Sequence, residues 1–194
     1  MIAVIDYNAG NIRSVMYALD RLGAEAVLTS DPAQIRAAEK VIFPGVGQAS
    51  TTMAWLQRHG LDALIRSLTQ PVLGICLGMQ LLCAHSEEGD TPCLGVVPAR
   101  VRRFVPARGE KVPHMGWNTI RQVQGPLFEA ADEVAWMYFV HSYYVETGPW
   151  TIAETDYVLP FSAAIRHDNF FATQFHPEKS GEAGMNVLRR FLAL

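Results

Sequence analysis

The sequence predicts an α/β protein built on a mostly parallel sheet that is covered by helices on both faces. In the first 85 residues, four short apolar runs alternate with segments whose apolar residues recur at helical spacing. The stretch from Pro71 to Gln80 joins one such run to a Gly-x-Cys-x-Gly turn and a helix-like segment. Strands that alternate with helices pair in parallel, and the chemistry of such sheets lies beyond the carboxyl ends of the strands.

The first half of the chain supplies these alternating elements. Gly23 ends the first expected helix and Gly60 separates two later ones, as glycine often does at helix ends. Asp31 can cap a helix that has Pro32 in its first position. The expected strands are residues 2–5, 24–28, 41–43 and 72–75, and the expected helices are residues 12–22, 32–38, 50–59, 61–68 and 77–85.

The second half changes to short strands separated by turns. No linker rich in proline, glycine or serine divides the chain, so we expect a single domain spanning residues 1–194. This domain would be a three-layer sandwich in which antiparallel strands are added to the parallel sheet. The added strands are expected at residues 100–105, 112–114, 135–145, 150–153, 163–166 and 170–175, and a closing helix from about Glu182.

The composition is that of a globular protein without a nucleic-acid or membrane partner. Hydrophobic residues make up 49%, the net charge is −3, and no apolar stretch approaches the roughly 18 residues of a membrane span. The N-terminus reads as a first strand and not as a signal peptide. The three cysteines, Cys76, Cys83 and Cys93, lack the spacing of a zinc site and suggest reduced thiols in a cytoplasmic protein. We expect no metal and no cofactor.

Cys76 occupies the turn of a nucleophile elbow, in which a strand enters a sharp bend and a helix follows. Gly74 and Gly78 flank it because a Cβ at either position would crowd so tight a turn. The start of a helix also favours a thiolate. The alternative is an ordinary buried cysteine, but the glycine spacing and the preceding strand both match the elbow.

A thiol nucleophile needs a base, and the base needs a group that orients it. The run Phe175-His-Pro-Glu178 places His176 at a strand end, with Glu178 two residues later on the same side. Glu178 could then hold one ring nitrogen while the other faces Cys76. The alternative for His176 alone is a buried structural histidine.

The reaction of a thiol with a carbonyl group also needs donors for an oxyanion. The backbone N–H of Leu77 follows the nucleophile directly, and a second donor could come from Val46 or Gly47 in a glycine-rich loop. That loop could also be a plain glycine turn. Gln80 lies one helical turn after Cys76 and can reach a substrate, although it could be an ordinary helix residue. Glu88 is expected at the end of this helix, where a carboxylate opposes the helix dipole.

At these residues the sequence resembles the class I glutamine amidotransferases, the Cys-His-Glu glutaminases. Gly74-Ile-Cys-Leu-Gly-Met-Gln80 and Phe175-His-Pro-Glu178 are similar to the two signatures of that family, and the resemblance covers essentially the whole chain. It implies a flavodoxin-like fold, with Cys76 as the nucleophile, His176 as the base and Glu178 as its orienter. It further implies that L-glutamine is held by Gly47, Gln80, Glu88, Ser142 and Tyr143. Glu88 would meet the α-ammonium group, and the backbone of Ser142 and Tyr143 would meet the α-carboxylate.

Within the family, four further stretches resemble the glutaminases that supply ammonia to a (βα)₈-barrel cyclase in histidine biosynthesis. They are residues 6–11, 44–47, 114–118 and 172–180. This resemblance implies a heterodimer that makes imidazole glycerol phosphate and AICAR and carries ammonia between its subunits. The partner face would hold Asn8, Asn11, Trp117 and Lys179. Sequence alone leaves open whether Trp117 is a surface anchor or a core residue.

Three other readings compete with this one. The chain could be the glutaminase of a different synthase, for instance one that aminates a sugar, because such a protein would share every catalytic residue. It could be a free-standing cysteine hydrolase, but related elbows often carry histidine directly after the cysteine, where this chain has Leu77. A non-catalytic binding module is opposed by the intact Cys76, His176 and Glu178. We also expect the loop at Gly45 and Gly47 to be turned into its active conformation by the partner.

Overall fold

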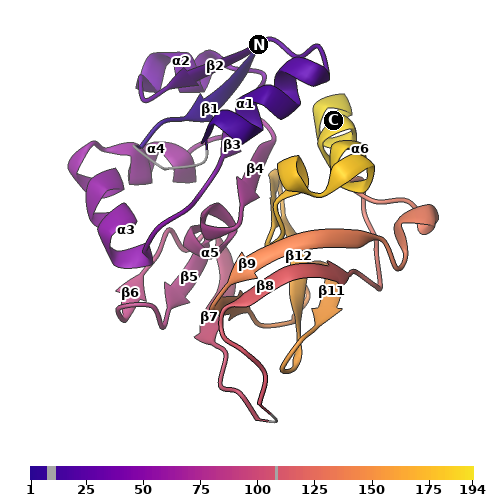
Figure 1. Cartoon of the computed structure of the whole chain (residues 1–194). Coiled ribbons are helices and arrows are strands. Elements are labelled where there is room, and N and C mark those ends of the chain that lie inside the picture. The colour runs from indigo at the N-terminus through magenta and orange to yellow at the C-terminus, as the bar shows by residue number, and fades with distance from the viewer. Residues whose placement is uncertain (8–11, 108) are drawn as a thin grey trace.

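A computed structural model describes residues 1–7, 12–107 and 109–194. Its centre is a seven-stranded sheet with the strand order β11-β12-β13-β4-β3-β1-β2 (Figure 1). Strands β13, β4, β3, β1 and β2 are parallel to one another, whereas β12 and β11 extend one edge in the antiparallel sense. The parallel strands are β1 (Ile2–Ile5), β2 (Ala26–Thr29), β3 (Lys40–Phe43), β4 (Val72–Ile75) and β13 (Phe170–Thr173), and the antiparallel strands are β11 (Thr151–Asp156) and β12 (Pro160–His167).

Helices cover both faces of this sheet and form the two outer layers. Along the parallel strands, alternate residues enter opposite cores: Ala3 and Val41 face one side, and Val4 and Ile42 face the other. The first core is closed by α2 (Pro32–Ala37), α3 (Ala49–Arg58), α4 (Leu61–Arg66) and α5 (Leu77–Leu82), and the second by α1 (Ile12–Arg21) and α6 (Gly181–Ala193). The α/β three-layer architecture expected from the sequence is therefore confirmed.

Local signals explain where several helices begin and end. Asp31 accepts a hydrogen bond from the Ala33 amide, and Pro32 occupies the first helical position of α2. Gly23 and Gly60 both have positive φ angles, of 68° and 67°, at the junctions where the sequence predicted breaks.

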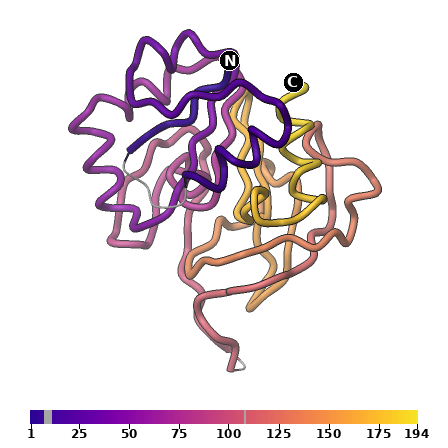
Figure 2. Tube along the Cα trace, turned by 45° about the horizontal axis from the view of Figure 1, so that its top comes forward, coloured from indigo at the N-terminus to yellow at the C-terminus, as the bar shows by residue number. Residues whose placement is uncertain are grey.

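Two smaller sheets pack beside the central one. A four-stranded sheet has the order β10-β7-β5-β6, and β8 pairs with β9 as an antiparallel hairpin. Their strands are β5 (Cys83–Ser86), β6 (Thr91–Pro92), β7 (Val97–Arg103), β8 (His114–Thr119), β9 (Trp136–His141) and β10 (Tyr143–Val145), and two short 3₁₀ turns are η1 (Ala130–Asp132) and η2 (Pro177–Lys179). Both views place the two chain termini at the same end of the molecule (Figures 1 and 2).

Three expectations about residues 77–145 are corrected by the structure. The helix expected over residues 77–85 ends at Leu82, because residues 83–86 pair with β7 as strand β5. The strand expected over residues 135–145 is broken at Ser142, so that β9 joins the hairpin and β10 joins the four-stranded sheet. The strand expected at residues 112–114 begins only at His114. Each difference depends on a pairing partner distant in sequence, which local patterns do not reveal.

Candidate active site

The chain bends sharply at Cys76, between β4 and α5. Cys76 has a φ of 53°, a value that L residues rarely adopt. Close packing of backbone makes the bend possible: a Cβ at Gly78 would overlap the carbonyl oxygen of Phe43, and one at Gly45 would overlap the amide of Gly78. The loop after β3 and the elbow are therefore pressed together without intervening side chains. The sequence predicted glycine at position 78 for a tight turn, but not this contact with a distant loop.

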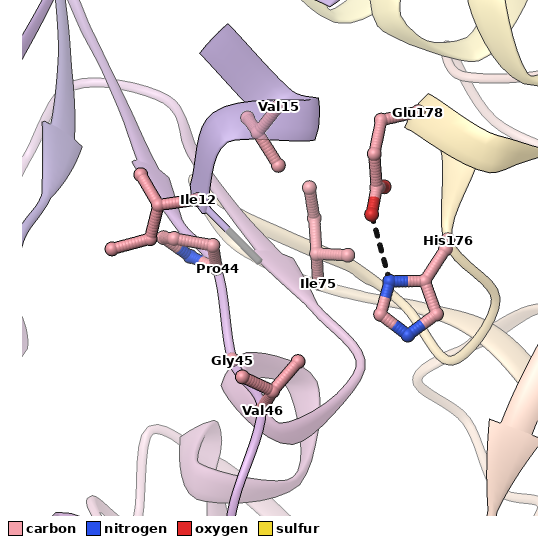
Figure 3. A pocket seen from close by; sticks show the side chains of 8 residues that line it. All are labelled: Ile12, Val15, Pro44, Gly45, Val46, Ile75, His176 and Glu178. Atoms are coloured by element: carbon pink, nitrogen blue, oxygen red, sulfur yellow. Dashed lines mark hydrogen bonds and ion pairs between the residues drawn. The ribbon is translucent and has the colours of Figure 1, made fainter. Parts of the chain in front are cut away.

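Strand pairing brings the candidate base to the candidate nucleophile. Strand β13 lies directly beside β4 with Thr173 opposite Ile75, and the Cys76 amide donates to the Thr173 carbonyl at 2.7 Å. Beyond the end of β13, His176 Nδ1 is 2.8 Å from Glu178 Oε1, and both side chains are almost fully buried (Figure 3). The geometry places the imidazole between the carboxylate and the thiol.

The positive charge of a protonated His176 is stabilised by the neighbouring Cys76 and Glu178. Burial acts to lower the pKa of His176, but the neighbouring Cys76 and Glu178 outweigh it and raise that pKa to about 10. An imidazole with this preference can accept a proton from the Cys76 thiol and keep it close to the sulfur. The Cys76 sulfur also accepts a hydrogen bond from Gln174 Nε2 at 3.6 Å. This arrangement can form a nucleophilic thiolate.

A cleft of about 330 Å³ opens beside the thiol. The chain folds so that all five residues expected to hold the substrate line it, together with Cys76, Leu77 and His176. These five residues are Gly47, Gln80, Glu88, Ser142 and Tyr143. They come from four separate segments, so the cleft exists only in the folded chain.

Two of the lining side chains are already held by other parts of the protein. Gln80 Nε2 donates to the Tyr143 carbonyl at 3.0 Å and to Gln174 Oε1 at 2.9 Å, so its amide is fixed at the wall of the cleft. Glu88 Oε2 accepts from the Ala49 amide at 2.7 Å, in the first turn of α3. The expectation that Glu88 closes a helix is wrong, because it follows strand β5 and its carboxylate instead meets the favourable end of α3.

One of the expected oxyanion donors is already engaged in this conformation. The Leu77 amide donates to the Gly45 carbonyl at 3.3 Å. Val46 and Gly47 line the cleft on the same loop. At the start of this loop, the Tyr7 hydroxyl donates to the Pro44 carbonyl at 2.7 Å, and Tyr7 is buried against Phe43. The loop is therefore fixed by two hydrogen bonds from neighbouring elements.

Two of the four residues expected at the partner face lie together on the surface. Trp117 is 53% exposed, which settles the question left by the sequence in favour of a surface residue. Its ring meets the edge of Tyr138 at 6.0 Å between centroids, and the Lys179 ammonium lies 6.0 Å from the Tyr138 ring. Asn8 and Asn11 lie outside the described residues.

Some residues of this site escaped the sequence reasoning. Gln174 bridges Cys76 and Gln80, and its position two residues before His176 on an extended segment was a usable signal. Nothing in the sequence pointed to the contact between Tyr7 and Pro44, which joins segments 37 positions apart. The described part of the chain contains no cluster of three or more His, Cys, Asp or Glu side chains suited to a metal ion. None of its helices is long and apolar enough to cross a bilayer.

The family model described as glutamine amidotransferase class-I matches residues 3–194. The chain belongs to this family. Relatives from Bacteroides fragilis (strain YCH46) and Bacteroides thetaiotaomicron, each named imidazole glycerol phosphate synthase subunit HisH, are 61% identical over 194 residues, which is 100% of this chain and 99% of each relative. A relative of the same name from Idiomarina loihiensis is 48% identical over 100% of this chain and 97% of its own length.

Solved structures share the fold at low sequence identity. The crystal structure of a putative GMP synthase protein from Thermoplasma acidophilum has a TM-score of 0.76 at 19% identity and covers 99% of this chain and 92% of that chain. The crystal structure of another protein, described as a glutamine amidotransferase, has a TM-score of 0.75 at 22% identity and covers 100% of this chain and 98% of that chain. These likenesses establish the fold.

Proposed function

We propose that the chain is the glutaminase subunit of imidazole glycerol phosphate synthase and hydrolyses L-glutamine to glutamate and ammonia for histidine biosynthesis. One observation carries this proposal: the elbow thiol and an imidazole held by Glu178 open together on a cleft lined by the five expected glutamine-binding residues. The full-length identity of 61% to the HisH relatives supports the choice of synthase.

The reaction proceeds through a thioester. His176 takes the proton of the Cys76 thiol, and the sulfur attacks the δ-carbonyl carbon of glutamine. The tetrahedral intermediate collapses as the C–N bond breaks, and His176 returns the proton to the leaving nitrogen, so that ammonia departs. Water then attacks the thioester with His176 as base, which releases glutamate and restores the thiol. Glu178 orients the imidazole throughout and stabilises its charged form.

The tetrahedral intermediate needs donors that the loop after β3 does not present while the Leu77 amide is engaged. We propose that the peptide between Gly45 and Val46 turns over, which releases the Leu77 amide and points the Val46 amide at the oxyanion. Glycine at position 45 supports this, because a residue without a Cβ can adopt the backbone angles of either peptide orientation. A partner that carries its own substrate would drive the change, so ammonia would be produced only when it can be used.

The proposed partner is a (βα)₈-barrel cyclase, which would form a heterodimer with this chain and receive its ammonia. A mostly apolar crevice of about 10 Å³, room for about one small molecule, lies beside His176 and Glu178 (Figure 3). Val46 and His176 line both this crevice and the glutamine cleft, whereas Ile12 and Val15 of α1 form its other wall. Ammonia would leave by this route, where apolar walls keep it unprotonated. The partner face would include Trp117 and Lys179, with Asn8 and Asn11 as further expected contacts.

The hydrolysis needs no cofactor, because the thiol, the imidazole and water supply every atom and proton of the reaction. A cytoplasmic location is part of the proposal, and the three free cysteines fit a reducing compartment.

The test measures glutamate released from glutamine by the purified chain, alone and mixed with a barrel cyclase and its ribonucleotide substrate. A large rise on mixing that is absent from the Cys76→Ala variant supports the proposal. No activity in any mixture, while the thiol still reacts quickly with a glutamine-like affinity label, would point to another synthase. No reaction with the label would contradict the chemistry itself.

A further inference from the structure

Two histidines outside the catalytic group form a buried pair under the wall of the glutamine cleft. His114 opens β8 and His141 ends β9, and the two are directly opposite in the hairpin. His114 Nδ1 is 3.0 Å from His141 Nε2, and the residues are only 4% and 6% exposed. His141 also lines the cleft with His176. The reaction proposed above uses neither histidine, although His114 belongs to one of the stretches that carry the family resemblance.

The hydrogen bonds around the pair allow only one placement of the protons. The Tyr143 carbonyl oxygen can only accept, and His141 Nδ1 lies 2.7 Å from it, so Nδ1 of His141 carries a hydrogen. In the neutral ring, Nε2 of His141 is then an acceptor, and its partner His114 Nδ1 must donate. Nε2 of His114 is left as an acceptor and faces Asn118 Nδ2 at 3.4 Å.

Asn118 is held in the orientation that this chain requires. Its Nδ2 donates to the Asp156 carbonyl at 2.8 Å, and its Oδ1 accepts from the Thr119 amide at 2.8 Å. The side-chain nitrogen of Asn118 therefore faces His114. This orientation agrees with Nε2 of His114 being a hydrogen-bond acceptor. The donors run in one direction from Asn118 through His114 and His141 to the backbone of Tyr143.

The surroundings of the pair keep both rings neutral. His114 stacks between Phe139 and Tyr157, with centroids 5.0 and 4.1 Å away. Burial lowers the pKa of His114 to about 4 and is the largest cause that lowers the pKa of His141 to about 3. The titratable groups that face the pair are the Tyr157 ring toward His114 and His176 toward His141. Among the described residues, no carboxylate side chain hydrogen-bonds to either ring.

We propose that His114 is a positioning residue that locks His141 as a neutral imidazole with its hydrogen on Nδ1, so that His176 is the sole proton acceptor for Cys76 in the cleft. This inference rests on the proposed glutaminase function. A second imidazole nitrogen with a free lone pair in the cleft would compete with His176 for the Cys76 proton, and the donor from His114 occupies that lone pair. The same lock holds the Tyr143 carbonyl, together with Gln80, and so fixes the backbone expected to meet the α-carboxylate of glutamine.

Substitutions of His114 can separate the hydrogen bond that it donates to His141 from its packing between Phe139 and Tyr157. His114→Phe keeps a flat ring between Phe139 and Tyr157 but removes the donor to His141. His141 Nε2 is then an unpaired acceptor in the cleft, where it can compete with His176 for the Cys76 proton. His114→Asn places an amide nitrogen close to the position of Nδ1 and restores the donor. His167→Phe, which replaces a side chain that is 42% exposed on β12, is the matched control.

The first measurement is ¹⁵N–¹H correlation NMR of the histidine side chains in the purified chain, which reports tautomer and protonation without any activity. The wild-type protein is expected to show Nδ1–H for His114 and His141 and no titration of either ring from pH 8 down to pH 5. An Nε2–H tautomer of His141, or its titration in this range, would overturn the inference even if the chain proves to be a glutaminase.

The second measurement is the pH dependence of kcat/KM for glutamine, with the chain in complex with the barrel cyclase and with thiol titration to count folded sites. In His114→Phe, the unpaired Nε2 of His141 should compete with His176 for the Cys76 proton and lower kcat/KM about tenfold across the pH range. His114→Asn should recover most of this loss, and His167→Phe should match the wild type. A His114→Phe profile that coincides with that of the wild type refutes the lock. If the wild type hydrolyses no glutamine, the proposed function fails while the NMR result still decides the tautomer.

Discussion

The amide of Leu77 donates its hydrogen bond to the carbonyl oxygen of Gly45, at 3.3 Å. A donor expected to stabilise an oxyanion is thus occupied by the loop that should supply the second donor. The same loop is held at its start by the Tyr7 hydroxyl, which donates to the Pro44 carbonyl at 2.7 Å. Any change that weakens these two contacts should favour the arrangement needed for catalysis.

Tyr7→Phe should raise the glutaminase kcat of the isolated chain. The substitution keeps the ring packed against Phe43 and removes the hydroxyl with its hydrogen bond to Pro44, a net stabilisation of about 1 kcal/mol or roughly fivefold in an equilibrium. The rise should therefore be several-fold, with KM little changed, in a steady-state glutamate assay. Tyr17→Phe, at an exposed tyrosine of α1, is the control. Unchanged or lower activity in Tyr7→Phe would show that this contact does not restrain the loop.

Glu178→Gln should lose activity and also change how stability depends on pH. The pKa of His176 is raised to about 10 in the folded chain, so its protonation stabilises the fold fully below the unfolded pKa of about 6.5. This stabilisation is lost as the pH rises toward 10. The Glu178→Gln substitution removes one of the groups that raise the pKa of His176. The free energy of unfolding of the variant should therefore fall below that of the wild type, and most strongly near pH 6.

Urea unfolding of the wild type and Glu178→Gln at pH 6 and pH 9 measures this difference. The difference in free energy of unfolding between the two proteins should be smaller at pH 9 than at pH 6. In a separate glutaminase assay, kcat of Glu178→Gln should be roughly 100-fold or more below that of the wild type. A difference in free energy of unfolding that is the same at both pH values would mean that Glu178 does not hold the proton on His176.

Glu88 combines two roles that substitutions can separate. Its carboxylate accepts from the Ala49 amide at 2.7 Å and also lines the cleft, where we expect it to meet the ammonium group of glutamine. Glu88→Gln keeps an oxygen for Ala49 but loses the charge, so KM should rise about tenfold with an unchanged Tm. Glu88→Ala should raise KM similarly and also lose about 1 kcal/mol of stability. Equal KM values in wild type and Glu88→Gln would exclude the ammonium contact.

Gly78→Ala should destabilise the fold strongly. The added Cβ would overlap the Phe43 carbonyl, and backbone on both sides leaves it no room to shift. We expect the free energy of unfolding in urea to fall by about 3 kcal/mol or more. Met79→Leu, at the next buried position of α5, conserves volume and should cost less than about 1.5 kcal/mol. If the two variants lost similar free energies of unfolding, Gly78 would not be packed as closely against the Phe43 carbonyl as the structure shows.

Trp117→Ala should weaken binding of the cyclase while leaving the free chain intact. Trp117 is 53% exposed, so its removal opens no cavity, but truncation of an interface tryptophan costs about 2 kcal/mol, roughly 30-fold in Kd. Calorimetric titration with the cyclase measures this effect. Trp136→Ala removes a tryptophan that is 59% exposed on the same hairpin and serves as control. Equal loss in both variants, or none in either, would remove Trp117 as the specific anchor.

The parts of the site that sequence could predict are those encoded by short spacings. The elbow glycines stand two positions on either side of Cys76, and Glu178 reaches His176 across one residue. The alternation of apolar runs and helical segments likewise predicted the parallel sheet. Ser142 and Tyr143 followed only from the family resemblance, because they act through backbone atoms that any residue possesses.

What the sequence did not predict depends on contacts between distant segments. The helix after Cys76 ends at Leu82 because β7 offers residues 83–86 a pairing partner. The Leu77 amide is occupied because the loop after β3 is pressed against the elbow. His114 and His141 are neighbours only because of the register in which β8 pairs with β9. The sequence around either histidine does not indicate that the other lies next to it.

The position of β13 beside β4 has a consequence for the newborn protein. Cys76 precedes His176 by 100 positions, so the thiol leaves the ribosome long before its base. Strand β13 must then insert between β4 and β12, both of which are made earlier. In the proposed mechanism, a nascent or prematurely terminated chain therefore carries Cys76 without its expected base and should not hydrolyse glutamine. Completion of the polypeptide would then be the first condition for ammonia release.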